Sequence, residues 1–258
     1  MKTFEIFTLL FLLAAPRLNA QSDGSARLAP GDAAFVQMDY PAAVRDYEQA
    51  LAEMPADPIL HWRLARVYVC IAEVEEEGQR RVAALRSAET HARECIRGDS
   101  LIWEGHTWLA AALGYLALEV GMQEQVSLSH ELLAESDRAL ALNPKDDIAL
   151  SIRGSFFRAL GNVGWLKRQL AKIFVGEIPD GGFAEAERSL LEAVALAPDI
   201  MRHRYELGVL YLDMGRIPEA CTLFAQAARL PVRVAIDRPR LAKIRVYLEE
   251  MKCEGEGH

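Results

Sequence analysis

The sequence has none of the short motifs that bind phosphate or build a hydrolase nucleophile. It contains no G-x-G-x-x-G, G-x-S-x-G or G-x-x-x-x-G-K segment, and these are the usual signatures of dinucleotide, acyl-transfer and nucleotide sites. Six histidines occur, but none belongs to an H-E-x-x-H motif, because His130-Glu131 lacks a second histidine four residues after the first. We therefore predict a protein that is not an enzyme and needs no cofactor.

Cysteine is scarce and dispersed. The four cysteines form no C-x-x-C pair, so a zinc knuckle is excluded and we predict no metal site. Cys70 and Cys95 fall on the two helices of one predicted pair, where Cys95 takes the place that alanine holds in other pairs. We favour two small buried residues over a disulfide between them, which is the alternative.

The sequence also has no excess of basic over acidic residues. The formal net charge is −8, and removing residues 1–20 deletes Lys2, Arg17 and Glu5 and leaves −9. Sequence-independent binding to nucleic acid requires a positive surface that neutralises phosphates. We therefore predict no nucleic-acid partner.

No apolar run is long enough to cross a bilayer. The first run, within residues 6–15, has roughly ten residues against the ~18 to 20 that a spanning helix needs. It follows Lys2 and precedes the small residue Ala20, which predicts a secretory signal peptide over 1–20, cleaved near Ala20-Gln21. The alternatives are that this segment is an uncleaved membrane anchor or an amphipathic import sequence, and that the chain is membrane-anchored or cytoplasmic. Residues 21–26 are polar and predict a flexible lead-in.

What the sequence does contain is a recurring spacing of small and bulky residues. Its clearest instance is a set of five residues that ends before Pro231, and no strand-like alternation of useful length accompanies it. The spacing resembles the tetratricopeptide repeat, in which helix pairs stack into a right-handed superhelix. The five residues are Gly208, Tyr211, Ala220, Phe224 and Ala227.

We predict an all-α fold with one tetratricopeptide solenoid over 27–252. It has about five helix pairs, an insertion at about 161–182, and a tail at 253–258. The second pair is about 11 residues overlong around the charged run 75–81, and the third is about ten residues overlong. Asp237 begins a last helix, whose apolar residues at helical spacing predict a cap over the final repeat.

From about 105 to 252 the chain resembles the regulator of microtubule dynamics family. The similar segments are GHTW at 105–108, LNPKD at 142–146 and WLKRQLAK at 165–172, followed by Pro179, Gly208 and Gly215. The resemblance implies a non-enzymatic scaffold, some of whose relatives associate with microtubules or organelle membranes. No functional motif can be transferred residue by residue.

The first helix of each pair lines the concave groove in tetratricopeptide arrays, and this places nine candidate residues for binding a protein or peptide. Aromatic and guanidinium groups among them suit peptide recognition, and the arginines could pair with carboxylates of an acidic or C-terminal segment. In the alternative, the aromatic residues pack on neighbouring helices and the arginines are solvated. The candidates are Trp62, Arg66, Thr107, Tyr115, Ser151, Ser155, Arg158, Arg202 and Tyr205.

The insertion carries a second candidate surface. Trp165 and nearby apolar residues share one helical face, and Lys167, Arg168 and Lys172 lie on the other side. Such a helix can contact an anionic membrane or a partner, but we favour a cap on the neighbouring helix pair. Taken together, the sequence predicts an exported scaffold, periplasmic or secreted, that binds a protein or peptide. The alternative is an intracellular or membrane-associated protein like the microtubule regulators.

Overall fold

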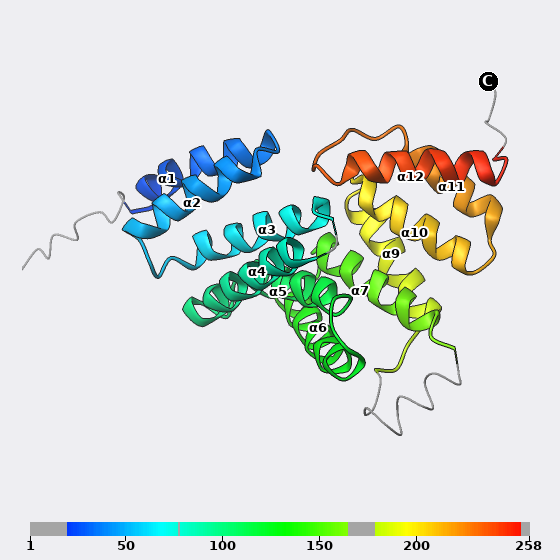
Figure 1. Ribbon diagram of the computed structural model, residues 1–258, viewed down its shortest axis with the longest axis horizontal. Coiled ribbons are helices and arrows are strands. Elements are labelled where there is room, and N and C mark those ends of the chain that lie inside the picture. Colours follow the sequence, from blue (N-terminus) through cyan, green and yellow to red (C-terminus); the bar gives the residue numbers. More distant parts are fainter. Residues whose placement is uncertain (1–19, 77, 165–178, 254–258) are drawn as a thin grey trace, which may run out of the picture.

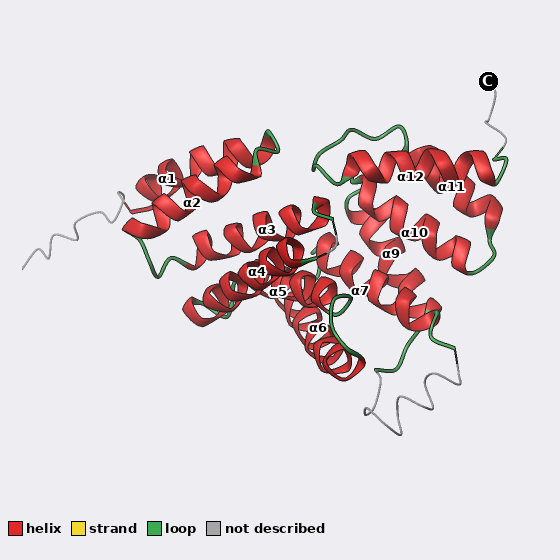
Figure 2. Cartoon of the chain, viewed as in Figure 1, coloured by secondary structure: helices red, strands yellow, loops and turns green. Residues whose placement is uncertain are grey.

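A computed structural model describes residues 20–76, 78–164 and 179–253, and within them every regular element is a helix (Figure 2). The all-α prediction is confirmed. No helix in these ranges is both long and apolar enough to cross a membrane. The elements are α1 (Ala20–Val36), α2 (Tyr40–Glu53), α3 (Pro58–Val74), α4 (Gln79–Gly98), α5 (Trp103–Leu116), α6 (Met122–Leu142), α7 (Asp147–Gly161), α9 (Phe183–Leu196), α10 (Met201–Asp213), α11 (Ile217–Ala227) and α12 (Asp237–Glu250).

The helices pack as five successive pairs: α1 with α2, α3 with α4, α5 with α6, α7 with α9, and α10 with α11. The first helices also contact one another from pair to pair, α3 against α5, α5 against α7 and α7 against α10. The pairs therefore turn about a common inner side (Figure 1). This arrangement matches the predicted solenoid.

Close approach within the fourth and fifth pairs explains the spacing of small and bulky residues there. A Cβ atom added at Gly208 would lie 2.7 Å from a ring carbon of Phe224, and one at Gly154 would lie 2.5 Å from Cγ of Leu190. The first helix therefore has no side chain where the second helix inserts a large one. Ala220 and Ala227, one turn on either side of Phe224, are fully buried in the same contact.

Aspartates begin two of the first helices. Asp57 Oδ1 accepts a hydrogen bond from Ile59 N at 2.8 Å, and Asp146 Oδ1 accepts from Ile148 N and Ala149 N at 3.1 Å. These bonds satisfy amide groups that have no partner inside the helix. The segment LNPKD therefore ends α6 and supplies the cap of α7.

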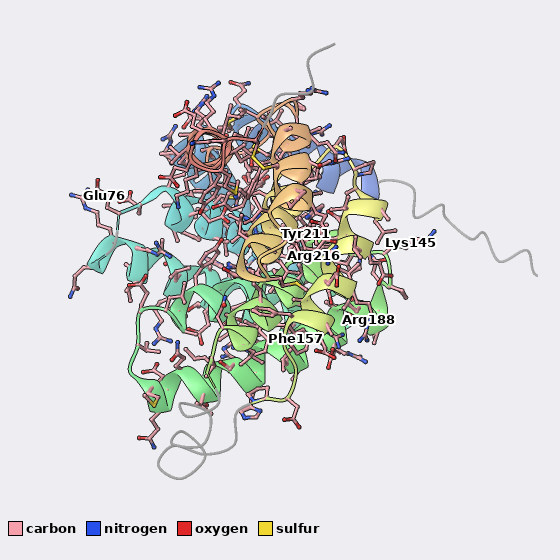
Figure 3. The ribbon with its side chains drawn as sticks, turned by 90° about the vertical axis from the view of Figure 1, so that its right-hand side faces the viewer. Glu76, Lys145, Phe157, Arg188, Tyr211 and Arg216 are labelled. Carbon is pink, nitrogen blue, oxygen red and sulfur yellow. A yellow bond between two sulfur atoms is a disulfide. The ribbon has the colours of Figure 1, made fainter. Side chains whose placement is uncertain are left out.

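The overlong pairs differ in where the extra length lies. Both helices of the second pair are long, with 17 residues in α3 and 20 in α4, whereas α6 has 21 residues against 14 in α5. Arginines of α4 pair with glutamates of the third pair at 2.6 to 3.0 Å, as Arg81–Glu119, Arg86–Glu124 and Arg93–Glu131. Figure 3 shows Glu76, in the turn between α3 and α4, at the outer edge of the molecule.

Helix α12 closes the solenoid. It packs on α10 and α11, where Tyr247 stacks on Phe224 with ring centroids 5.1 Å apart. A disulfide that the sequence analysis did not predict joins Cys221 of α11 to Cys253, just after α12. Ala235, in the loop before α12, donates its amide hydrogen to Tyr40 of α2 at 2.9 Å. The loop that precedes α12 thus contacts the first helix pair.

Three sequence predictions have specific outcomes. Cys70 and Cys95 are buried free thiols, as we favoured. Helix α1 begins at Ala20, so the backbone of 21–26 is helical where we expected a flexible lead-in; polar composition favours solvent exposure without preventing helix formation. Trp165, Lys167, Arg168 and Lys172, together with residues 254–258, lie outside the described residues, so the predictions for them are untested.

Candidate functional site

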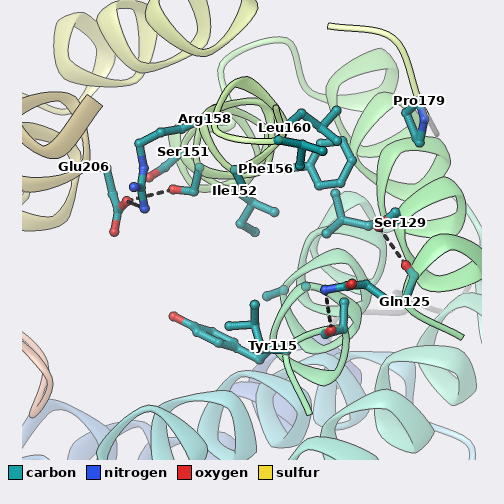
Figure 4. Close-up of a pocket in the computed structure, with 18 of the residues that line it drawn as sticks. Tyr115, Gln125, Ser129, Ser151, Ile152, Phe156, Arg158, Leu160, Pro179 and Glu206 are labelled. Carbon is teal, nitrogen blue, oxygen red and sulfur yellow. Dashed lines mark hydrogen bonds and ion pairs between the residues drawn. The ribbon is translucent and has the colours of Figure 1, made fainter. Parts of the chain in front are cut away.

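A pocket of about 870 Å³ opens between α5, α6 and α7 and is bounded at one end by α10. Figure 4 shows Tyr115 facing Ile152 and Phe156 across it, with Pro179 and Ser129 at the far side from Glu206. Its walls are mainly apolar. The lining residues are Ala111, Gly114, Tyr115, Ala117, Leu118, Met122, Gln125, Val126, Ser129, Leu132, Ser151, Ile152, Ser155, Phe156, Arg158, Ala159, Leu160, Val163, Pro179, Arg202 and Glu206.

The pocket has an exposed apolar mouth and a buried base. Leu118 and Met122, around the turn from α5 to α6, are 67% and 61% exposed, whereas Ser151 at the base is 1% exposed. The mouth exists because α6 begins beyond the end of the shorter α5, so its first turns stand partly uncovered. Exposed apolar side chains beside a cavity are typical of a binding site.

The α10 end of the pocket is polar. Ser155 Oγ donates to Glu206 Oε2 at 3.1 Å, and Arg158 pairs with Asp213 at 3.0 Å and with Glu206 at 3.7 Å. Ser151 Oγ and Arg158 Nε are buried and have no hydrogen-bond partner. Figure 4 shows Ser151, Arg158 and Glu206 gathered at this end. Two donors are therefore left unsatisfied at the inner edge of an otherwise apolar pocket.

Behind this end lies a buried carboxylate, Glu73 of α3, with a 2% exposed side chain. Its Oε1 accepts hydrogen bonds from Tyr115 Oη at 2.5 Å, from Arg202, and from Arg240 of α12 at 3.3 Å. Burial alone would raise the pKa of Glu73, but Arg202 and Arg240 hold it below its usual value. Burial and the charge of Glu73 raise the pKa of Tyr115. Glu73 is thus a charged hub that joins four helices.

Five of the nine predicted groove residues line the pocket: Tyr115, Ser151, Ser155, Arg158 and Arg202. Their arginines are not free to meet a ligand's carboxylate, because each already pairs within the chain, Arg158 with Asp213 and Arg202 with Glu73. The other four predicted residues lie away from the pocket.

Trp62 and Arg66 belong to a contact between α1 and α3. The Arg66 guanidinium lies 3.7 Å from the ring centre of Phe35 and 5.2 Å from that of Trp62. Its Nη2 pairs with Asp32 at 3.7 Å. In the alternative interpretation, the aromatic residues pack on neighbouring helices and the arginines are solvated. Trp62 packs in this way, whereas Arg66 forms an ion pair.

Thr107 and Tyr205 have structural contacts. Thr107 is buried and donates to Asp146, the cap of α7; burial raises the pKa of Asp146 to about 6 even though this hydrogen bond opposes the rise. Tyr205 packs against Phe224, with ring centroids 6.2 Å apart, in the cluster that α12 covers. Neither side chain lines the pocket.

The sequence analysis missed the wall formed by α6. Met122, Gln125, Val126 and Ser129 come from a second helix, whereas we searched only the first helices. The signal that could have located them is the extra length of the third pair, which the sequence did show. It places about two turns of α6 beyond the end of α5.

Three buried or half-buried histidines, His61, His91 and His203, also have structural partners. His61 and His91 lie 3.0 Å apart between their Nδ1 atoms, and burial together with His61 lowers the pKa of His91 to about 4. His203 contacts Asp147 at 2.7 Å through Nε2. Within the described ranges no group of three His, Cys, Asp or Glu residues could hold a metal ion.

The stacked helix pairs, their glycine contacts and the inner-side pocket define a tetratricopeptide-type superhelix. Among solved structures, the chain is similar to a thermophilic tetratricopeptide protein of Thermus thermophilus, with a TM-score of 0.64 and 24% identity over 86% of this chain and 98% of that one. It is also similar to yeast Tom70, with a TM-score of 0.53 and 18% identity over 93% of this chain and 43% of that one. These likenesses establish the fold.

The chain belongs to the family described as regulator of microtubule dynamics protein 1-3, whose model matches residues 28–252. It is 23% identical to regulator of microtubule dynamics protein 2 of Mus musculus over 74% of this chain and 47% of that protein. It is 26% identical to protein 3 of Xenopus laevis over 72% of this chain and 41% of that protein. The chain therefore spans less than half the length of these relatives. The resemblance seen from residue 105 onward extends to residue 28.

Proposed function

We propose that this protein is a non-enzymatic scaffold that binds a segment of a partner protein in the pocket between α5, α6 and α7. The observation that carries the proposal is the pocket itself, of about 870 Å³, with an exposed apolar mouth. Its volume lies within the range of known ligand sites. Repeat solenoids commonly use their concave surfaces for binding.

The polar groups of the pocket support a binding role over a catalytic one. Ser155, Arg158, Arg202 and Glu206 are occupied by hydrogen bonds and ion pairs within the chain. Among the described residues, no histidine lines the pocket, and no base stands beside Ser151, whose hydroxyl has no hydrogen-bond partner. A serine nucleophile needs a base within hydrogen-bonding reach.

The test is capture of partners from the protein's native compartment, followed by mass spectrometry. Ala159 is exposed and lines the pocket, so Ala159→Trp should fill the mouth without disturbing the core. Ala195→Trp, on an exposed position of α9 outside the pocket, is the matched control. We expect specific partners to be lost with Ala159→Trp and kept with Ala195→Trp. An identical partner set for both variants would contradict the proposal.

We further propose that the protein is exported after removal of residues 1–20. The pattern of a basic start, a short apolar run and a small residue supports this, and so does the Cys221–Cys253 disulfide, because disulfides persist in oxidising compartments. Intact-mass measurement of the chain recovered from its native compartment tests it. A mass that still includes Met1 would contradict cleavage.

A second candidate function is that of an intracellular or membrane-associated protein that acts on microtubules. Family membership favours it, since the relatives are named as regulators of microtubule dynamics. The two candidates differ in compartment. Fractionation of a C-terminally tagged chain, followed by co-sedimentation with microtubules, discriminates them: an exported chain that does not sediment supports the first, and a cytoplasmic chain that sediments supports the second.

A further inference from the structure

We propose that the pocket recognises an uncharged, apolar segment of its partner, and that Ser151 and Arg158 bind one main-chain carbonyl oxygen of that segment. The inference rests on the proposed function, because it specifies the chemistry of the segment that the scaffold binds.

The first step concerns charge. Each charged group at the polar end already has a partner: Arg158 pairs with Glu206 and Asp213, and Arg202 pairs with Glu73. Including Arg240 and Asp237, which extend this network, there are three positive and four negative side chains. A ligand carboxylate would lose its hydration and gain no free cation, which is unfavourable in a buried site.

The second step concerns hydrogen bonds. Ser151 Oγ and Arg158 Nε are buried and without a partner, and an Nε–H group can only donate. A buried donor left without an acceptor is costly, so the site favours a ligand that supplies an acceptor. An ammonium group has none, and it would meet the positive charge of Arg158. A neutral carbonyl oxygen has two lone pairs and satisfies both donors.

The third step concerns the shape of the pocket. The mouth is formed by Leu118 and Met122, which are largely exposed. The apolar walls include Ile152 and Phe156 (Figure 4). An open mouth lets a polypeptide main chain enter while its apolar side chains are buried. Main-chain carbonyls are present in every such segment, so the polar end adds orientation while the walls select apolar side chains.

The experiment is a selection from a synthetic library of random heptapeptides with acetylated N-termini and amidated C-termini, using the mature chain. We expect enrichment of sequences rich in apolar residues and free of Asp, Glu, Lys and Arg. Their binding should be abolished by Ala159→Trp and unchanged by Ala195→Trp. Isothermal titration of the enriched peptides then provides dissociation constants for further variants.

Two variants test the carbonyl site. Ser151→Ala removes one donor, and Arg158→Lys keeps the charge but removes Nε. Each variant should raise the dissociation constant of the enriched peptides roughly two- to tenfold, the range for one hydrogen bond. The melting temperature of Ser151→Ala should not fall, because the hydroxyl has no partner in the free protein. A purely structural role for Ser151 predicts the reverse, a lower melting temperature and unchanged affinity.

The contrary outcomes are separable. If charged peptides are enriched and lose binding with Ala159→Trp, the pocket is a partner site but this inference is wrong. Nile red, a neutral dye, serves as a small apolar probe of the same pocket. If Ala159→Trp weakens the binding of no enriched peptide, or weakens the binding of Nile red alone, both the inference and the proposed polypeptide partner fail. If Ser151→Ala and Arg158→Lys bind as the wild type does, the carbonyl assignment fails while the apolar preference stands.

Discussion

Among single residues, His106 is a buried histidine whose two ring nitrogens both have partners. Its Nδ1 lies 2.5 Å from Glu135 Oε2, and its Nε2 lies 3.1 Å from the carbonyl oxygen of Ser100. Burial by itself lowers the pKa of His106, but the hydrogen bonds to Glu135 and Ser100 outweigh it, so the pKa is raised above its usual value. The protonated ring is thus favoured in the folded state.

The sign of the resulting pH dependence follows from linkage. A raised pKa in the folded state stabilises the protein fully below the unfolded value of about 6.5, and this contribution is lost as pH rises through the folded pKa. We expect the free energy of unfolding, measured with urea from pH 6 upward, to decline as pH rises. The total decline should be about 1.4 kcal/mol for each pH unit by which the folded pKa of His106 exceeds the unfolded one. His106→Gln should flatten this part of the profile. An unchanged slope in the variant would assign the pH dependence to other groups.

At the scale of helices, the close contact of α10 with α11 is tested by Gly208→Ala. Alanine favours helix over glycine by about 1 kcal/mol. Here its Cβ would lie 2.7 Å from the fully buried Phe224, and overpacking of this kind costs typically ~1–3 kcal/mol. We therefore expect net destabilisation in chemical unfolding. Gly164→Ala is the control, because no atom of the described residues lies within 4 Å of its added Cβ, and it should change stability by less than about 0.5 kcal/mol.

These contacts show why the helix pairs could be predicted from sequence. A glycine that faces a bulky residue of the next helix recurs along the chain, as Gly208 with Phe224 and, across the insertion, Gly154 with Leu190, and these contacts mark the pairs directly. The end of the insertion at about 182 and the start of the last helix at Asp237 were also predicted from local signals, and α9 and α12 begin at Phe183 and Asp237. Signals confined to one pair can be read without knowing the rest of the fold.

The hub at Glu73 is a contact between helices that no local pattern shows. Its partners Arg202 and Arg240 are 129 and 167 residues away in sequence, and they meet it only because the solenoid turns. The arginines of the predicted groove therefore have partners that sequence reasoning could not supply. The α6 wall of the pocket was missed for a different reason, because only the first helices were searched and the extra length of α6 was not used.

Removal of the Glu73 carboxylate tests how far this hub stabilises the fold. Glu73→Gln should leave Arg202 buried without a counter-ion, and breaking a buried pair from one side costs typically ~3–5 kcal/mol. The double variant Glu73→Leu with Arg202→Met removes both charges and should recover much of that loss. Chemical unfolding of the two variants measures it. A double variant that is no more stable than Glu73→Gln would show that Arg240 or Tyr115 needs the carboxylate as much as Arg202 does.

In the whole molecule, two independent links bring the C-terminal part back onto the earlier helices. One is polar: Ala235 donates to Tyr40, and Arg240 donates to Glu73. The other is covalent, the Cys221–Cys253 disulfide, which holds the end of α12 on α11. The disulfide does not touch the pocket, whereas Arg240 donates to Glu73, which also accepts from Tyr115 and Arg202 of the pocket lining. The disulfide is therefore the link that can be perturbed separately from the binding site.

The disulfide gives the sharpest test of that separation. Its cysteines are 32 residues apart, and closing a loop of this length stabilises a protein by about 3–4 kcal/mol in the chain-entropy model. Cys221→Ser with Cys253→Ser, or the wild type treated with dithiothreitol, should lose stability of this order. Hydrogen exchange should rise first in α12, where apolar contacts with α10 and α11 are then the main restraint, while α5, α6 and α7 keep their protection. Equal loss of protection at the pocket would mean that the solenoid unfolds as one cooperative unit, in which closure by α12 also governs the binding site.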